Sequence, residues 1–332
     1  MKAFRINTVK FHCMRTFITA LKSLKIGEDL GRGDKIESDT FITNNKEVIK
    51  SFITPNFIKI AGILESNFIL DSSAVIYKEE NSDGMNRGGI EKLDKFNSKI
   101  KLFQTCLWLI KDNSAYTELG YCITKKKKAI KIDSNFLTSI YTNASGNKRT
   151  TDFTREELRK ARYIYKNIEE IAPYEVSFAA KKRGLNRFER ALFYVQIARS
   201  NDDLSLKISE YCSTLESLLS TNPNEIAHQL SERVAILIGQ NKSDRNQIYR
   251  EIKKAYGIRS KIVHGAKISD KEIKGIPQLS RKLDSYLRIV FLKISDDEYW
   301  PIFKSDNQEI DNYFLNQIFE MQSISGEEKD ES

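Results

Sequence analysis

The second half of the chain carries apolar residues at intervals of three and four, the period of an amphipathic helix. Thr154 and Glu157 have the spacing of a capping box and predict a helix that runs to about Glu170. The same period predicts further helices over 185–200, 203–220, 223–238, 243–256 and 277–294. Because short polar segments separate them, we expect residues 151–300 to form an all-helical bundle.

The first half shows no single period. Residues 11–24 are interpreted as a short helix. Residues 52–70 are rich in Ile and Phe and contain Pro55 and Gly62, so they are interpreted as short strands joined by turns.

Clearer patterns follow in the rest of this half. Residues 90–110 have helical spacing, and residues 117–132 predict one or two strands interrupted by the four lysines of 125–128. The polar stretch 142–151 reads as a linker.

The predicted fold class is therefore α+β. A mixed α/β or β-rich domain over 1–150 precedes the all-α bundle of 151–300. Residues 301–332 form a C-terminal extension, whose acidic end is expected to be disordered.

Composition fits a folded chain with a polyanionic partner. With 40% hydrophobic and 30% charged residues, the chain is too apolar to be disordered. Its net charge is +9, and residues 1–150 hold 25 basic against 16 acidic side chains. Residues 151–300 hold 27 against 21, whereas 301–332 hold 2 against 8. The basic surplus therefore lies outside the C-terminal extension, and RNA is one partner that it favours.

Other classes of protein are disfavoured. No run of about 18 apolar residues predicts a membrane span, and the N-terminus has no signal-peptide pattern. The four cysteines are widely spaced, which indicates reduced thiols in a cytoplasm. With three histidines in all, neither a metal site nor a cofactor is expected.

One short basic stretch combines residues that suit RNA cleavage. Arg259 and His264 are separated by four residues between two predicted helices. An arginine holds a phosphate with a permanently charged fork of donors, and a histidine exchanges a proton near neutral pH. The alternative is that the two residues form a surface pair or a helix-end cap.

Three blocks, taken together, resemble the HEPN superfamily and most closely its Apea-like group. The blocks are Leu215–Leu219, Leu230–Ala235 and Tyr256–Gly265, in the order and spacing that this group shows. The resemblance covers residues 183–294 and implies that the bundle is HEPN-like. Ser260 follows the arginine where many members have Asn, Asp or His.

The resemblance implies a metal-independent endoribonuclease. Such enzymes leave a 2′,3′-cyclic phosphate and a 5′-hydroxyl, and they typically serve bacterial antiviral defence, abortive infection or toxin systems. Arg259 and His264 match the catalytic motif. Glu216 matches a recurrent acidic position that orients one of the two, or else it makes an ordinary ion pair.

The expected partners are RNA, single-stranded or tRNA, and a second copy of the chain. Acid–base cleavage needs two proton-transfer groups and the motif supplies one histidine, so the resemblance implies a homodimer through the bundle. The candidates for RNA binding are Lys181, Lys182, Arg183, Arg187, Arg190 and Lys261. An inhibitor or sensor partner is also expected.

A different class of function stays open. The bundle is then a non-catalytic dimerisation or RNA-binding module within a defence or toxin–antitoxin system. His228, beside Ile226 and Leu230 on a predicted helix, is interpreted as a boundary residue and not as a base.

Overall fold

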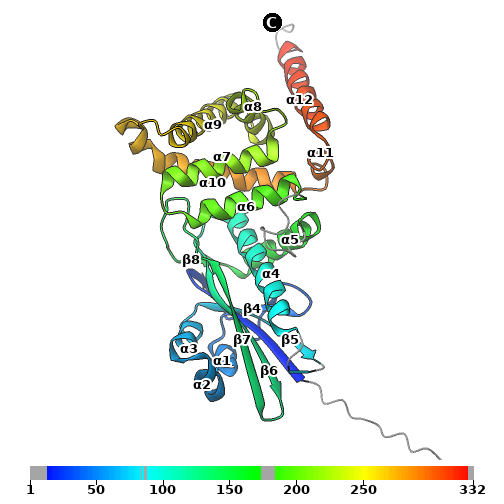
Figure 1. Cartoon of the computed structure of the whole chain (residues 1–332). Coiled ribbons are helices and arrows are strands. Elements are labelled where there is room, and N and C mark those ends of the chain that lie inside the picture. The colour runs from blue at the N-terminus through cyan, green and yellow to red at the C-terminus, as the bar shows by residue number, and fades with distance from the viewer. Residues whose placement is uncertain (1–12, 83, 86–87, 173–183, 328–332) are drawn as a thin grey trace, which may run out of the picture. The chain divides into compact units, whose positions relative to one another are not determined.

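The computed structural model describes residues 13–82, 84–85, 88–172 and 184–327 (Figure 1). An antiparallel sheet region precedes a helical region, which confirms the α+β class. The chain divides into two compact units. The sheet unit holds the described residues up to Gln104, then Ala115–Ile140 and Thr150–Arg162, and the helical unit holds Thr105–Ser114, Tyr141–Arg149 and the chain from Tyr163 onward.

The sheet unit is built on six antiparallel strands in the order β3-β4-β5-β1-β6-β7. Their bounds are β1 Cys13–Leu21, β3 Asp34–Lys35, β4 Thr40–Thr43, β5 Ala74–Ser82, β6 Thr117–Lys126 and β7 Ala129–Ser139. A separate parallel pair joins β2 (Leu24–Ile26) to β8 (Thr151–Phe153). Of the one or two strands predicted around the four lysines, the structure has two, β6 and β7, and Lys127 turns the hairpin between them with φ +54°.

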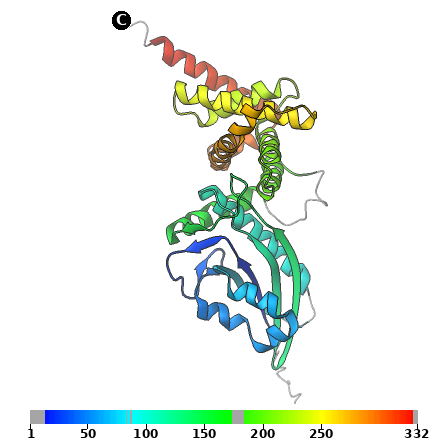
Figure 2. The same ribbon diagram turned by 90° about the vertical axis from the view of Figure 1, so that its left-hand side faces the viewer.

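Helices cover both faces of this sheet (Figure 2). On one face α1 (Lys46–Phe52), α2 (Pro55–Ala61) and α3 (Ile63–Leu70) bury an apolar core with alternate residues of β1, β5 and β6. On the other face lies α4 (Gly89–Ile110), where the Phe96 and Phe17 ring centroids are 5.7 Å apart. A Cβ at Gly120 would lie 2.2 Å from Asn97 Oδ1, so glycine permits this close approach of α4 to the sheet.

Two predictions for the first half were wrong. Residues 11–24 were expected to be helical, but 13–21 form the central strand β1, which is buried on both faces. Residues 52–70 were expected to be strands, but they form α2, α3 and the last residue of α1. Pro55 begins α2, whose N-cap is Thr54, and Gly62 at φ +106° ends it.

The helical unit confirms the predicted bundle. Its helices are α5 Arg155–Ile171 (whose first half belongs to the sheet unit), α6 Arg187–Ser200, α7 Leu204–Leu219, α8 Ile226–Ile238, α9 Lys242–Val263, α10 Asp270–Ile294, α11 Trp300–Phe303 and α12 Asn307–Glu327. Helix α7 packs against α6, α8, α9 and α10. Three starts differ from expectation. Helix α8 begins at Ile226 and leaves Pro223 outside it, Asn241 caps α9 in place of Ser243, and α10 begins at Asp270 and holds Pro277 inside.

Much of the C-terminal extension is also helical. Helix α12 runs to Glu327, and the acidic end that was expected to be disordered lies outside the described residues from 328 on.

A buried carboxylate lies inside the helical unit. Asp284 of α10 is 1% exposed, and its Oδ1 accepts hydrogen bonds from Trp108 Nε1 at 2.7 Å and from the Tyr211 hydroxyl at 3.0 Å. Its Oδ2 accepts from Arg288 Nε at 3.0 Å. Asp284 therefore ties the segment around Trp108 to α7 and α10.

The stretch read as a linker is part of this core. The Thr142 N–H donates to the Arg199 carbonyl at 2.7 Å, and Ser280 Oγ donates to the Ala144 carbonyl at 2.6 Å. Lys207, fully buried, donates to Thr142 Oγ1 at 3.0 Å. Thr142 and Ala144 thus take part in buried hydrogen bonds of the helical unit, whereas residues 147–150 are exposed.

Replacing Asp284 by Ala should destabilise the helical unit. The substitution leaves the donors of Trp108, Tyr211 and Arg288 without their acceptor, so we expect a loss of about 3–5 kcal/mol in the free energy of unfolding. Urea titration followed by fluorescence measures it, since both tryptophans, Trp108 and Trp300, lie in this unit. The exposed Asp297→Ala is the control and should stay within about 0.5 kcal/mol of wild type; equal losses in both variants would contradict the assignment.

Asp112 should make stability depend on pH. Burial, and then repulsion by Asp284, raises the pKa of Asp112 to about 6. The folded state then holds this proton more tightly than the unfolded chain does. The unfolding free energy of wild type relative to Asp112→Asn should therefore fall, by on the order of 1–3 kcal/mol, as the pH rises from about 4 to about 6. Urea titrations across this range test it, and parallel curves for the two proteins would show that Asp112 does not titrate this way.

Candidate active site at the end of helix α9

Helix α9 carries the arginine of the motif and ends at its histidine. Gly265 adopts φ +66°, and its N–H donates to the Ile262 carbonyl at 3.3 Å. The Ala266 N–H donates to the Lys261 carbonyl at 2.8 Å, which completes a Schellman motif. His264 is therefore the C-cap of α9, with an exposed side chain. The expectation that the whole motif lies between two helices was wrong, because Arg259 is inside the last turns of α9.

Arg259 joins a small polar cluster between α7 and α9. Its Nη2 lies 3.2 Å from Glu216 Oε1 and 3.3 Å from Oε2. Its Nη1 donates to the Tyr256 hydroxyl at 3.0 Å, and its Cζ lies 5.0 Å from the centroid of that ring. Of the two partners that the sequence left open for Glu216, the structure brings it to Arg259.

This cluster retains unused hydrogen-bonding atoms. Among the described residues, Arg259 Nε is buried and has no acceptor. Glu216 Oε1 is also buried and accepts no hydrogen bond, because Nη2 lies at ion-pair distance but outside hydrogen-bond geometry. Buried polar atoms are normally paired, so such atoms need an explanation, and a ligand that completes the set is one.

Neighbouring groups are not activated for chemistry. Burial raises the pKa of the Cys212 thiol to about 12, so the thiol stays protonated and is no nucleophile at neutral pH. Burial, together with the charge of Glu216, also raises the pKa of the Tyr256 hydroxyl. Tyr256 therefore acts in this cluster as a neutral hydrogen-bond partner.

The structure does not bring His264 to the other two candidates within one chain. Five positions of helix correspond to about 7.5 Å of rise and about 140° of rotation, so the side chains of Arg259 and His264 leave the helix on different sides. In the described part of the chain, the His264 side chain has no hydrogen bond or ion pair. Glu216 and Arg259 thus form one cluster, and His264 stands apart at the tip of the helix.

The RNA-binding candidates have different surroundings. Lys261 pairs with Glu272 at 2.6 Å, and hydrogen bonds from Lys261 and Ser269 hold the pKa of Glu272 at about 2. Arg187 is half-buried and donates to the Ser220 carbonyl at 2.7 Å. Arg190 is exposed and donates to the Leu185 carbonyl at 2.7 Å. The other three candidates, Lys181, Lys182 and Arg183, lie outside the described residues.

An open groove of about 530 Å³ extends from this cluster. Its walls include Glu216 of α7 and three residues of α6, Arg187, Arg190 and Tyr194. Tyr194 and Tyr256 were not predicted as site residues. The spacing of four from Arg190 to Tyr194, and of three from Tyr256 to Arg259, was the signal that pointed to a shared helix face.

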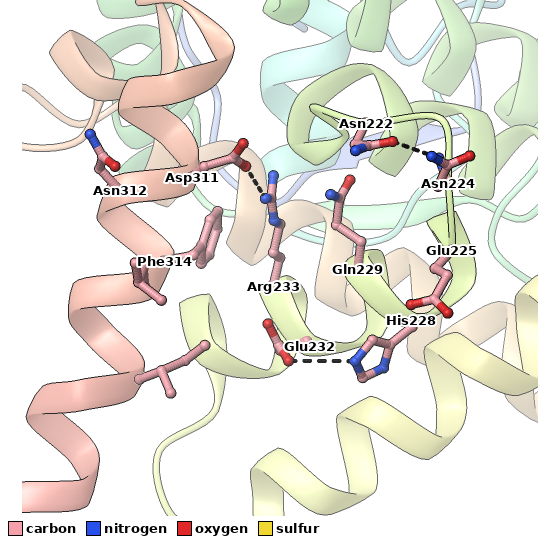
Figure 3. Close-up of a pocket in the computed structure, with 12 residues that line it drawn as sticks. Asn222, Asn224, Glu225, His228, Gln229, Glu232, Arg233, Asp311, Asn312 and Phe314 are labelled. Carbon is pink, nitrogen blue, oxygen red and sulfur yellow. Dashed lines mark hydrogen bonds and ion pairs between the residues drawn. The ribbon is translucent and has the colours of Figure 1, made fainter.

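A second pocket, of about 500 Å³, lies between α8 and α12 and contains His228 (Figure 3). His228 Nδ1 and the Tyr249 hydroxyl are 2.9 Å apart, and Nε2 lies 3.8 Å from Glu232. Neither Arg259 nor His264 lines this pocket. His228 is therefore a suitable control residue for experiments on His264.

Comparisons with known proteins add no relative. No family model matches this sequence, and no curated protein or solved structure was found to be similar to it. Within the described ranges, no three His, Cys, Asp or Glu side chains gather as a metal ion would require. No helix among the described residues has both the length and the apolar character needed to cross a bilayer.

Gly265 should be required for the way α9 ends. A Cβ at this position meets open space, but φ +66° is costly for alanine, so Gly265→Ala should lower the unfolding free energy by about 1 kcal/mol. Gly257 of the same helix also faces open space but has ordinary helical dihedrals, so Gly257→Ala should instead stabilise by about 0.5–1 kcal/mol. Urea titration compares the two variants, and a shift of the same sign in both would contradict the Schellman assignment.

Proposed function

We propose that this chain is a metal-independent endoribonuclease of the HEPN type. The observation that carries the proposal is the half-buried Arg259, held by Glu216 and Tyr256 with an unused buried Nε donor, five residues before the exposed His264. This arrangement offers a fixed cation and a proton-transfer group near one helix end. The resemblance of the three sequence blocks to the Apea-like group supports the same activity.

The proposed reaction uses the RNA strand's own nucleophile. A histidine takes the proton of a ribose 2′-hydroxyl, and the oxygen attacks the adjacent phosphorus. Arg259 stabilises the negative charge that develops on the phosphorane oxygens. The bond to the 5′-oxygen breaks as that oxygen receives a proton, which leaves a 2′,3′-cyclic phosphate and a 5′-hydroxyl.

The second proton-transfer group is proposed to come from a second copy of the chain. Because the side chains of Arg259 and His264 leave α9 on different sides, one copy alone does not bring both groups to the same phosphate. A two-fold dimer through the bundle would place two such sets in one cleft. Val263, 60% exposed beside His264, leaves this end of α9 accessible to a partner.

The cellular setting is part of the proposal. We place the protein in the cytoplasm, as an effector of antiviral defence, abortive infection or a toxin system, with single-stranded RNA or tRNA as its substrate. An inhibitor or a sensing partner would restrain it in a healthy cell. Four buried free cysteines are compatible with a reducing compartment.

A second candidate function follows from the pairing of Arg259. An arginine held by a carboxylate and a tyrosine is also what a structural ion pair looks like. On that interpretation the bundle is a non-catalytic dimerisation or RNA-binding module. Loss of RNA cleavage on mutation, measured without metal, separates the two functions.

Substitution of the two motif residues should abolish cleavage. With a chelator present, His264→Ala should reduce the cleavage rate by about 10²–10⁴-fold, because a proton-transfer group is lost. Arg259→Ala should reduce it by at least about 10²-fold through loss of charge stabilisation. The measurement is the appearance of 2′,3′-cyclic phosphate ends on labelled RNA.

The matched control is His228→Ala, which removes a histidine from the separate pocket beside α12 and should leave the rate unchanged. Undiminished cleavage by both motif variants would refute the mechanism. Absence of cleavage by the wild-type dimer would favour the non-catalytic module.

A further inference from the structure

We infer that the groove between α6 and the α7–α8 connection is a subsite for one nucleotide of single-stranded RNA, in which Tyr194 stacks on a base and Arg190 holds a phosphate. This inference rests on the proposed function, because it assigns a place for the substrate beside the Glu216–Arg259 pair. The groove, of about 530 Å³, lies within the range of about 300–1,000 Å³ that small-molecule ligands occupy.

Three side chains of α6 face the groove together. Arg187, Arg190 and Tyr194 are spaced by three and by four, so they share one face of the helix, and all three line the groove. The Tyr194 side chain is half-buried and Arg190 is exposed. An aromatic ring beside a cation is the combination with which proteins hold single strands without reading their sequence.

The side chains that line the groove carry a net positive charge. Glu216 is the one carboxylate in the lining of this groove, and it is neutralised by Arg259 at 3.2 Å. The groove therefore keeps the positive charge of its two arginines. The α7–α8 connection contributes Ser220 and Thr221, whose side chains are neutral and add no negative charge to the lining.

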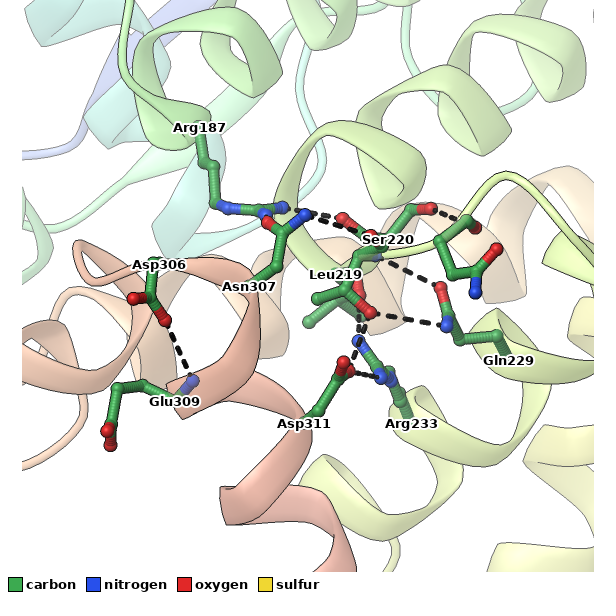
Figure 4. A network of polar contacts seen from close by, with 11 residues as sticks. Arg187, Leu219, Ser220, Gln229, Arg233, Asp306, Asn307, Glu309 and Asp311 are labelled. Atoms are coloured by element: carbon green, nitrogen blue, oxygen red, sulfur yellow. Dashed lines mark hydrogen bonds and ion pairs between the residues drawn. The ribbon is translucent and has the colours of Figure 1, made fainter.

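Hydrogen bonds hold the floor of the groove, Ser220 and Thr221 of the α7–α8 connection, in place (Figure 4). Arg187 donates to the Ser220 carbonyl at 2.7 Å, and Asn307 Nδ2 donates to the Thr221 carbonyl at 2.9 Å. Thr221 Oγ1 donates in turn to Asp311 at 2.6 Å. Arg187 is thus half-buried and held by the scaffold, whereas Arg190, which donates from Nη1 to the Leu185 carbonyl, is exposed and is the cation proposed for the phosphate.

The groove lies next to the pair formed by Glu216 and Arg259. Glu216 belongs both to the groove lining and to the ion pair with Arg259. A strand whose scissile phosphate lies at Arg259 would therefore enter the groove with a neighbouring nucleotide. Arg190 and Tyr194 should therefore govern how tightly RNA binds and not the chemistry of the cut.

The test measures RNA binding in a background that does not cut. Fluorescence anisotropy follows a labelled single-stranded RNA of about ten nucleotides on the His264→Ala chain. Adding Tyr194→Ala should weaken binding by about 5- to 150-fold, the value of one stacked base, whereas Tyr194→Phe should restore it. Adding Arg190→Ala should reduce the slope of log affinity against log salt by about 0.7, the value for one phosphate contact.

The matched control is Arg281→Ala, an exposed arginine of α10 that does not line the groove and should leave the salt slope unchanged. If wild type cuts RNA while Tyr194→Ala changes neither Kd nor KM, the subsite is refuted and the proposed function stands. If wild type does not cut RNA but Tyr194→Ala still weakens binding, the proposed function fails and the subsite stands. The inference is also overturned if the chain does not bind RNA. It is overturned as well if the chain binds duplex RNA more tightly and Tyr194→Ala leaves that binding unchanged.

Discussion

The helical unit depends on a charged group that is removed from water. Asp284 is 1% exposed and accepts hydrogen bonds from Trp108, Tyr211 and Arg288. Beside it lie two buried cations, Arg199 and Lys207, and burial lowers the pKa of Lys207 to about 8. Buried charges are tolerated only where partners surround them, so each segment that supplies a partner is fixed in place. Helix α7, which donates Tyr211 to this network, is therefore held rigidly at the centre of the bundle.

Helix α7 connects this buried network to the candidate site. Glu216 lies five residues after Tyr211 on the same helix, and it faces Arg259 of α9 at 3.2 Å. A second network fixes the end of α7, where Arg233 Nη1 donates to the Leu219 carbonyl at 2.6 Å. Buried polar contacts thus act along most of α7, and the groove between α6 and the α7–α8 connection has a firm wall. Because this wall is already ordered, less conformational entropy would be lost when a strand binds in the groove.

The sequence predicted the helical half well and the sheet half poorly, for physical reasons. Long amphipathic helices such as α7 and α10 have one buried face, and their period is visible over several turns. Strand β1 is covered on both faces, so Cys13–Leu21 shows a nearly continuous buried run and not the alternation of a half-exposed strand. Helices α1–α3 have seven or eight residues each, too few for the period to appear, and Pro55 and Gly62 mark helix ends rather than strand turns.

The candidate site was visible in the sequence only where its residues are close in the chain. Arg259 and His264 stand five residues apart, but the ion pair that holds Arg259 spans 43 residues and depends on how α7 packs against α9. His264 is the C-cap of α9, five positions and about 140° of helical rotation from Arg259, and Gly265 with its positive φ ends the helix directly after it. Arg259 and His264 are therefore close in the sequence, but their side chains lie apart in the structure. This separation is the reason for proposing a second copy of the chain, because one copy alone does not bring the two groups together.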